Sequence, residues 1–131
     1  MSPAIPARAG RVLVVDDDDN VRDVTGMILE DMGYQVRTTG SGSEALRWLG
    51  EEPYDLLVLD VKMPEVDGPS LYRAVVARWS KAAPRALFVS GFGEADCHAG
   101  ALIVPPDVPI LFKPFTLEEV QAAIDRALPA A

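Results

Sequence analysis

The stretch Val-Leu-Val-Val-Asp-Asp-Asp-Asp-Asn, residues 12–20, is an apolar run of four residues followed by four consecutive aspartates. A Val- and Leu-rich run of this length is typical of a parallel strand that is buried on both faces. Similar runs follow at Leu56–Leu59, Ala86–Val89 and Pro109–Phe112. The weaker run Tyr34–Thr39 alternates in character, which favours an edge strand.

Between these runs, apolar residues recur at helical spacing and predict amphipathic helices. Their stripes are Val21, Val24, Ile28 and Met32, ended by Gly33; Leu46 and Leu49, after a Ser41–Glu44 capping box; Leu71, Val75 and Trp79; and Leu117, Val120, Ile124 and Leu128, after a Thr116–Glu119 capping box. A weaker helix is expected within residues 94–102, which the prolines from Pro105 onward must end early. The alternation of strands and helices predicts an α/β fold with a parallel sheet and helices on both of its faces.

Length and composition limit the classes of protein that fit. The chain has 131 residues, a net charge of −8 and 49% hydrophobic residues, which suits one globular domain. We expect a disordered tail over residues 1–10 and one folded domain over residues 11–129. The negative charge argues against direct nucleic-acid binding, and no apolar run is long enough to insert into a membrane. Without a signal peptide, and with Cys97 as the single cysteine, a cytoplasmic location is expected.

Polar residues follow the predicted central strands at the point where each strand ends. Asp16 and Asp17 follow the first run, Asp60 the next, and Ser90 and Lys113 the last two. Because ligands of open α/β sheets bind outside the carboxyl ends of the strands, we expect these side chains to meet at one edge.

These side chains suit the transfer of a phosphoryl group. Two carboxylates about 4 Å apart repel by roughly 4 kcal/mol at an effective dielectric of 20, so they favour a bound cation or a shared proton. Oxygen ligands favour Mg²⁺. A carboxylate can also act as a nucleophile and form an aspartyl phosphate, which the metal, an ammonium and a hydroxyl would stabilise.

Four segments together resemble the receiver domain of two-component response regulators: Val12–Arg22, Leu57–Pro64 with Asp67-Gly68, Ser90-Gly91, and Lys113–Phe115. The resemblance extends over about residues 11 to 129. It implies a flavodoxin-like (βα)5 fold, a doubly wound sandwich whose five-stranded parallel sheet has the order 2-1-3-4-5.

The resemblance also implies a role for each matching residue. Asp60 matches the phosphoacceptor. Three residues match metal ligands: Asp17 binds Mg²⁺ directly, Asp16 holds the ion through water, and Lys62 binds it through its backbone carbonyl. Ser90 matches the hydroxyl that bonds the phosphoryl group, and Lys113 matches the lysine that pairs with the phosphoryl group. The Lys113–Pro114 bond is expected to be cis, as is common in this family.

The sequence departs from the family pattern in two regions. Ile110 occupies the position where the family often has Tyr or Phe. The coupling that the family usually shows between its Ser/Thr, here Ser90, and this aromatic residue is therefore in doubt. Residues 100–109 are rich in proline, so the usual dimer face is altered and a monomer or weak dimer is expected. The sequences of Phe88–Phe92 and Phe112–Thr116 are similar to those of receivers in hybrid sensor kinases. The receiver could therefore be a stand-alone protein or a domain excised from a larger chain.

The function expected from the resemblance is a signalling switch. A sensor histidine kinase or a histidine phosphotransfer protein would phosphorylate Asp60, and the change would alter binding to an unidentified downstream effector. No turnover of a separate substrate is expected. Two alternatives remain: a pseudo-receiver that binds partners without phosphorylation, and an Mg²⁺-dependent phosphohydrolase. The phosphohydrolase is disfavoured because Lys62 stands where such enzymes carry a second aspartate.

Three further features have simpler explanations. Residues 40–45 match the dinucleotide fingerprint G-x-G-x-x-A, but they follow the second strand rather than the first. His98, the single histidine, lies in a polar stretch without a catalytic partner, and we interpret it as a surface residue. Nothing in the sequence marks Cys97 as an activated thiol.

Overall fold

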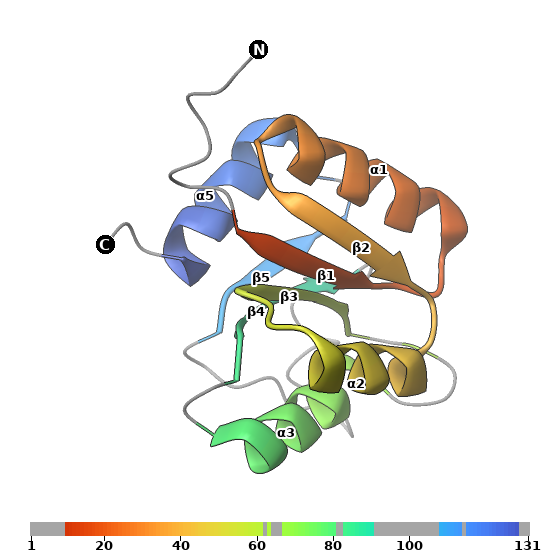
Figure 1. The fold of residues 1–131 in the computed structure, drawn as a ribbon. Coiled ribbons are helices and arrows are strands. Elements are labelled where there is room, and N and C mark those ends of the chain that lie inside the picture. Colours follow the sequence, from red (N-terminus) through yellow and green to blue (C-terminus); the bar gives the residue numbers. More distant parts are fainter. Residues whose placement is uncertain are drawn as a thin grey trace.

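Five parallel strands form one sheet in the order β2-β1-β3-β4-β5 (Figure 1). The strands are β1 (Arg11–Val15), β2 (Gln35–Thr39), β3 (Leu56–Asp60), β4 (Arg85–Ser90) and β5 (Ile110–Phe112), and the helices are α1 (Asp19–Asp31), α2 (Gly42–Glu51), α3 (Gly68–Trp79) and α5 (Leu117–Ala127). This computed structural model describes residues 10–61, 63, 67–80, 83–90, 108–113 and 115–128. The predicted α/β fold and its strand order are confirmed. The helix expected within residues 94–102 lies outside the described residues.

The helices cover the sheet on both faces, with α1 and α5 on one and α2 and α3 on the other (Figure 1). Successive residues of a strand point to opposite faces, so β1 contributes to both layers of the core. Val12 and Val14 belong to the cluster that contains Ile124 of α5. Leu13 and Val15 belong to the cluster formed with α2 and α3. Burial on both faces explains why the central strands are continuous apolar runs. By contrast, β2 alternates in burial, as expected for an edge strand.

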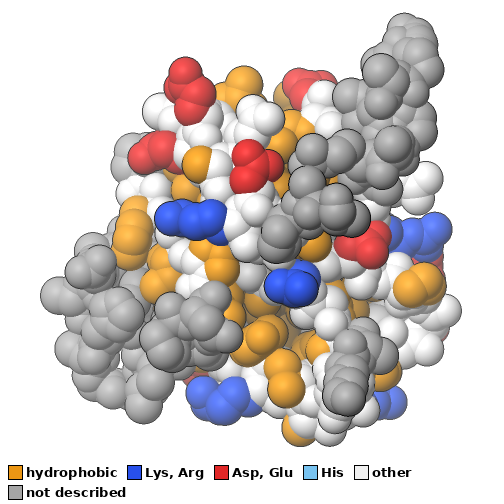
Figure 2. Space-filling view, turned by 90° about the vertical axis from the view of Figure 1, so that its left-hand side faces the viewer, with side chains coloured by type: hydrophobic (Ala, Val, Ile, Leu, Met, Phe, Trp, Pro, Cys, Tyr) orange, Lys and Arg blue, Asp and Glu red, His pale blue; other side chains and the backbone are white. Residues whose placement is uncertain are grey.

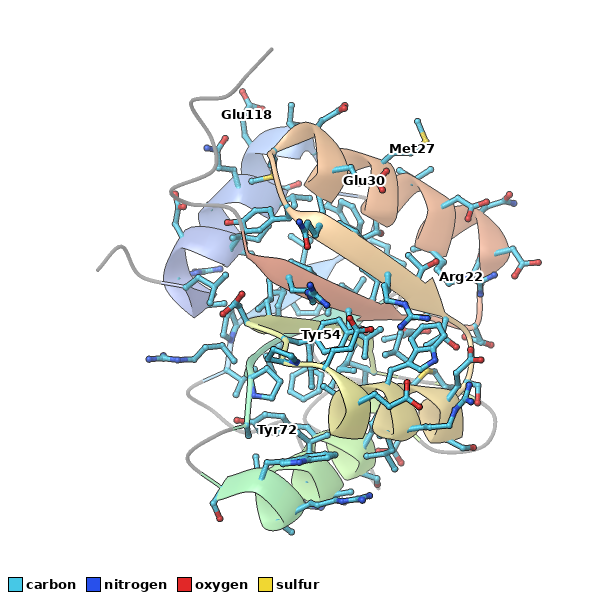
Figure 3. The ribbon with its side chains drawn as sticks, in the orientation of Figure 1. Arg22, Met27, Glu30, Tyr54, Tyr72 and Glu118 are labelled. Atoms are coloured by element: carbon cyan, nitrogen blue, oxygen red, sulfur yellow. The ribbon has the colours of Figure 1, made fainter. Side chains whose placement is uncertain are left out.

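Val24 and Leu117 belong to the predicted helix stripes but are exposed, so their placement on the buried faces was wrong. In α1 the buried side is centred on Thr25 and Leu29, whereas Val24 is 51% and Met27 62% exposed. An α-helix has 3.6 residues per turn, so Val24 points about 100° away from the neighbouring Thr25. Figure 3 shows Met27 on the outer side of α1. In α5, Leu117 is the first helical residue and is 56% exposed, before the buried stripe begins.

One of the two predicted capping boxes is complete. At α5, Thr116 Oγ1 accepts the Glu119 N–H and the Glu119 carboxylate accepts the Thr116 N–H. At α2, Ser41 Oγ accepts the Glu44 N–H, but the Ser41 N–H donates to Thr39 Oγ1. The Thr39 hydroxyl in turn donates to Glu44 Oε1 at 2.5 Å. Thr39 at the end of β2 therefore bonds both members of the predicted capping box, in place of the bond from the Ser41 N–H to the Glu44 carboxylate.

No helix in the described part of the chain is long and apolar enough to cross a membrane.

Candidate functional site

The sheet places the predicted site residues at one edge by its register. Val15 of β1 pairs with Leu59 of β3, so the next residues, Asp16 and Asp60, leave adjacent strands at the same level. In β4 and β5, Ser90 pairs with Phe112, and Lys113 follows directly. The residues that sequence analysis selected at the ends of four strands are therefore neighbours at one end of the sheet.

Backbone hydrogen bonds continue the ladders beyond the strands and fix these positions. The Asp16 N–H donates to the Thr39 carbonyl at 3.0 Å, and the Lys113 N–H donates to the Ser90 carbonyl at 2.8 Å. On the other side of Asp60, the Val61 N–H donates to the Val89 carbonyl at 2.8 Å. The side chains at this edge thus project from backbone that the sheet itself holds in place, which is the rigidity a reactive site needs.

Three carboxylates gather at this edge. One oxygen from each of Asp16, Asp17 and Asp60 lies within 4.8 Å of the other two. Asp16 and Asp60 are buried, with 3% and 6% exposure, whereas Asp17 is exposed. At an effective dielectric of 20, two charges this far apart repel by roughly 3 kcal/mol. The cluster is therefore electrostatically poised to accept a cation.

Lys113 supplies a positive charge beside the two buried acids. Its Nζ lies 3.5 Å from Asp16 Oδ2 and 3.8 Å from Asp60 Oδ1, and its side chain is mostly buried. One ammonium next to three carboxylates leaves an excess of negative charge. It also places a cation where a group attached to Asp60 could contact it.

The first turn of α1 shapes the loop that carries Asp16 and Asp17. The Asp18 N–H donates to Asp16 Oδ1 at 2.9 Å, which orients the buried carboxylate. Asp18 itself is the N-cap of α1, where its carboxylate accepts the backbone N–H groups of Asn20 and Val21. The acidic run is thus divided between the cluster and the helix cap.

Arg22 of α1 contributes to this loop through contacts that the sequence pattern does not indicate. Its guanidinium donates to the Asp16 carbonyl at 2.8 Å and to Asp19 Oδ1 at 2.5 Å (Figure 3). A Cβ added at Gly40 would lie 2.9 Å from Arg22 Nη1, so the glycine leaves room for the guanidinium. Arg22 of α1 and Gly40, which follows β2, are 18 residues apart in the chain, so no local sequence pattern predicts that they are neighbours.

Replacing Arg22 with Ala is expected to lower the free energy of unfolding by about 1.5–3 kcal/mol, because the Asp16 carbonyl loses a charged donor. Urea denaturation followed by circular dichroism would measure this. Arg47→Ala is the matched control. Arg47 pairs with Glu44 at 3.5 Å on an exposed helix surface, so its loss should change stability by less than about 0.5 kcal/mol. Equal effects of the two substitutions would contradict the role of Arg22.

The start of α3 lies against the backbone of Asp60. Gly68 donates its N–H to the Val61 carbonyl at 3.0 Å, and Asp67 caps the helix by accepting the Ser70 N–H at 2.7 Å. A Cβ on Gly68 would lie 2.3 Å from the Asp60 carbonyl oxygen. The Asp67-Gly68 pair of the sequence motif therefore combines a helix cap with a close approach of two backbone segments.

Several predictions fall on residues that the structure does not describe. These are the Lys62 carbonyl as a metal ligand, the cis bond to Pro114, and the readings of Cys97 and His98. Ile110 is described: it lies in β5, is partly buried and packs against the cluster formed with α2 and α3. A branched aliphatic side chain thus occupies the position at which the family often has an aromatic ring.

The donor set at this edge fits Mg²⁺. In octahedral geometry with ligands at about 2.1 Å, oxygens lie about 3.0 Å apart when adjacent and about 4.2 Å when opposite. Three carboxylate oxygens that all lie within 4.8 Å of one another are near enough to converge on one ion of this size. Oxygen ligands of high charge density also suit this hard cation better than a softer metal.

Known proteins resemble this chain in sequence. Residues 12–125 match the family model described as the response regulator receiver domain. The chain is 34% identical to the response regulator receiver protein CpdR of Brucella abortus, over 92% of this chain and 98% of that protein. It is 37% identical to the sensor kinase CckA of the same organism, over 89% of this chain but only 12% of the kinase.

A solved structure shares the fold over nearly its full length. The chemotaxis protein CheY4 of Vibrio cholerae superposes with a TM-score of 0.77 at 28% identity, covering 92% of this chain and 99% of that one. The family model, the sequence relatives and the solved structure therefore agree with one another on the family and the fold.

Proposed function

This chain belongs to the response regulator receiver family, and we propose that Asp60 is the residue through which it acts as a phosphoacceptor switch. The observation that carries this proposal is the position of Asp60, buried at the end of β3 with carboxylates on one side and Lys113 3.8 Å away. A carboxylate held between a metal-binding cluster and an ammonium can gain a phosphoryl group whose charge both cations neutralise.

In the proposed reaction, a carboxylate oxygen of Asp60 attacks the phosphorus of a phosphohistidine. A bond between oxygen and phosphorus forms, the bond between phosphorus and nitrogen breaks, and the imidazole nitrogen keeps the electron pair. Lys113 is proposed to pair with an oxygen of the transferred group, and its position 3.8 Å from Asp60 supports this role. Ser90, buried at the end of β4, is proposed to donate its hydroxyl to another of these oxygens.

We propose Mg²⁺ as the resident cation, with Asp17 and Asp60 as direct ligands, Asp16 bound through water, and the Lys62 carbonyl completing the protein ligands. The bound ion would neutralise charge on the incoming phosphoryl group. Asp17 is exposed and can meet an ion from solvent, whereas Asp16 is already engaged by the Asp18 N–H and Lys113. That difference supports a direct role for Asp17 and an indirect one for Asp16.

Replacing Asp17 with Asn should weaken Mg²⁺ binding about tenfold or more, because the cluster loses one of its three negative charges. Isothermal titration with MgCl₂ would measure the affinity. Asp19→Asn is the matched control: Asp19 is in the same acidic run but outside the cluster, with its side chain 83% exposed and paired with Arg22. If both variants lose the same affinity, the acidic run attracts ions without a defined site.

Receiver domains of this family interact with histidine kinases, and we propose a sensor histidine kinase or a histidine phosphotransfer protein as the donor. The chain would act in the cytoplasm as a monomer or weak dimer, with residues 11–129 as the receiver domain. It would promote its own phosphorylation and dephosphorylation and turn over no separate substrate. Phosphorylation would shift its preference for a downstream effector by biasing two states of the loops around Asp60.

The direct test is to incubate the protein with acetyl phosphate, with and without Mg²⁺, and to record the intact mass. A gain of one phosphoryl group that requires Mg²⁺ is expected. No gain by a folded protein would contradict the proposal and favour a receiver that binds its partners without phosphorylation.

A further inference from the structure

A cavity of about 250 Å³ lies at the end of the sheet opposite to the acidic cluster. It opens between the end of α3, the starts of β4 and β5, and the end of α5. Its apolar lining includes Val76, Pro84, Val108 and Pro109. The ring of Tyr72 also lines it and is fixed from behind by an edge-to-face contact with Phe88 at 5.9 Å. Figure 2, which faces this side of the molecule, shows hydrophobic side chains gathered in its lower half with basic side chains around them.

Two arginines, Arg85 and Arg126, line the same cavity. Neither forms an ion pair with a carboxylate among the described residues. Four other described arginines do form such pairs: Arg11, Arg22, Arg37 and Arg47. On a chain of net charge −8, these two guanidiniums, which have no carboxylate partner in the described part of the chain, form a local basic patch beside the cavity. The patch is complementary to an anionic ligand.

The size of the cavity favours an anchoring side chain over a whole small molecule. Pockets for drug-sized ligands and cofactors occupy roughly 300–1,000 Å³, which is more than this cavity offers. Protein interfaces commonly place one aromatic or aliphatic anchor in a pocket and surround it with polar contacts, in which arginine is enriched. Arginine also pairs well with carboxylates in two-point geometry.

We propose that this cavity, with Arg85 and Arg126, is a docking site for an acidic peptide segment of a protein partner. One apolar side chain of the segment would enter the cavity against Val76 and Pro109, and neighbouring carboxylates would pair with the two guanidiniums. The site is separate from the phosphoacceptor, because β4 and β5 begin beside the cavity and end at Ser90 and just before Lys113. Binding there leaves the acidic cluster free.

The test is a titration of the full ¹⁵N-labelled chain with capped model peptides, followed by NMR. The peptide acetyl-Glu-Glu-Phe-Glu-Glu-amide should shift the amide signals of residues around the cavity, such as Ala83, Ala86 and Ala127, with a Kd of about 1 mM or lower. Replacing its Phe with Ala should weaken binding about tenfold, because the anchor is lost. The lysine counterpart, acetyl-Lys-Lys-Phe-Lys-Lys-amide, should not shift the signals of these residues.

Variants of the protein separate this proposal from general attraction. Arg85→Gln combined with Arg126→Gln should weaken binding of the glutamate peptide about fivefold, since both charge pairs are removed. Arg73→Gln is the matched control, because Arg73 also lacks a carboxylate partner among the described residues but bonds Ser70 on α3, outside the cavity lining. All three arginines are exposed, so the variants should fold.

Absence of binding by the glutamate peptide would overturn the proposal. So would binding that maps to residues away from the cavity, or an equal loss of affinity in the Arg73 variant and the double variant. None of these outcomes depends on phosphorylation, so the two proposals can fail independently.

Discussion

Replacing Asp60 with Asn is expected to abolish the Mg²⁺-dependent gain of a phosphoryl group from acetyl phosphate. The amide has nearly the same shape as the carboxylate, but its oxygen is a poor nucleophile and it carries no negative charge to attract a cation. The folded structure should survive, because the change removes one of three mutually repelling charges. Intact mass spectrometry of both proteins after the same incubation would measure the effect, which should be a complete loss.

The control for this experiment is Asp31→Asn, at the exposed end of α1 and outside the acidic cluster. It should accept a phosphoryl group as the unaltered protein does. Circular dichroism of each variant would establish that it is folded. If the Asp60 variant still gained one phosphoryl group, the acceptor would lie elsewhere, and tandem mass spectrometry would distinguish Asp16 from Asp17.

Sequence alone was enough to predict the strands and the edge of the sheet where the site lies. Runs such as Val12–Val15 and Leu56–Leu59 are apolar at every position, which is a strong signal because both faces of a central strand are buried. Once the strands are parallel, Asp16, Asp60 and Lys113 must emerge at the same edge. This part of the site follows from topology and requires no knowledge of side-chain contacts.

The side-chain contacts that shape the loops could not be predicted in this way. Arg22 is 6 residues from Asp16 along the chain and bonds its carbonyl, while the glycine that makes room for the guanidinium lies beyond β2. The exposed position of Leu117 has a similar cause. Its spacing fits the helical stripe, but it is the first residue of α5 and is 56% exposed. Helical spacing predicts the direction in which a side chain points, but not whether another part of the protein covers it.

Replacing Gly68 with Ala is expected to lower the free energy of unfolding by about 2–3 kcal/mol and to slow phosphorylation of Asp60. The added Cβ would lie 2.3 Å from the Asp60 carbonyl oxygen and 3.2 Å from the Cα of Val61. Both atoms belong to backbone, which cannot turn aside as a flexible side chain can. Either α3 or the end of β3 must therefore shift, and a shift of β3 displaces the phosphoacceptor relative to Lys113. Urea denaturation and the rate of mass gain with acetyl phosphate would measure the two effects.

Gly50→Ala is the matched control and should change stability in the opposite direction. Gly50 lies within α2, and the nearest atom to an added Cβ is a ring carbon of Trp79 at 3.9 Å, an ordinary contact. Alanine in a helix is favoured over glycine by about 0.5–1 kcal/mol, so this variant should be as stable as the unaltered protein or slightly more stable. A Gly68 variant with unchanged stability and rate would show that the start of α3 can move without disturbing Asp60. In that case the glycine of the Asp67-Gly68 motif would not be needed to position the acceptor.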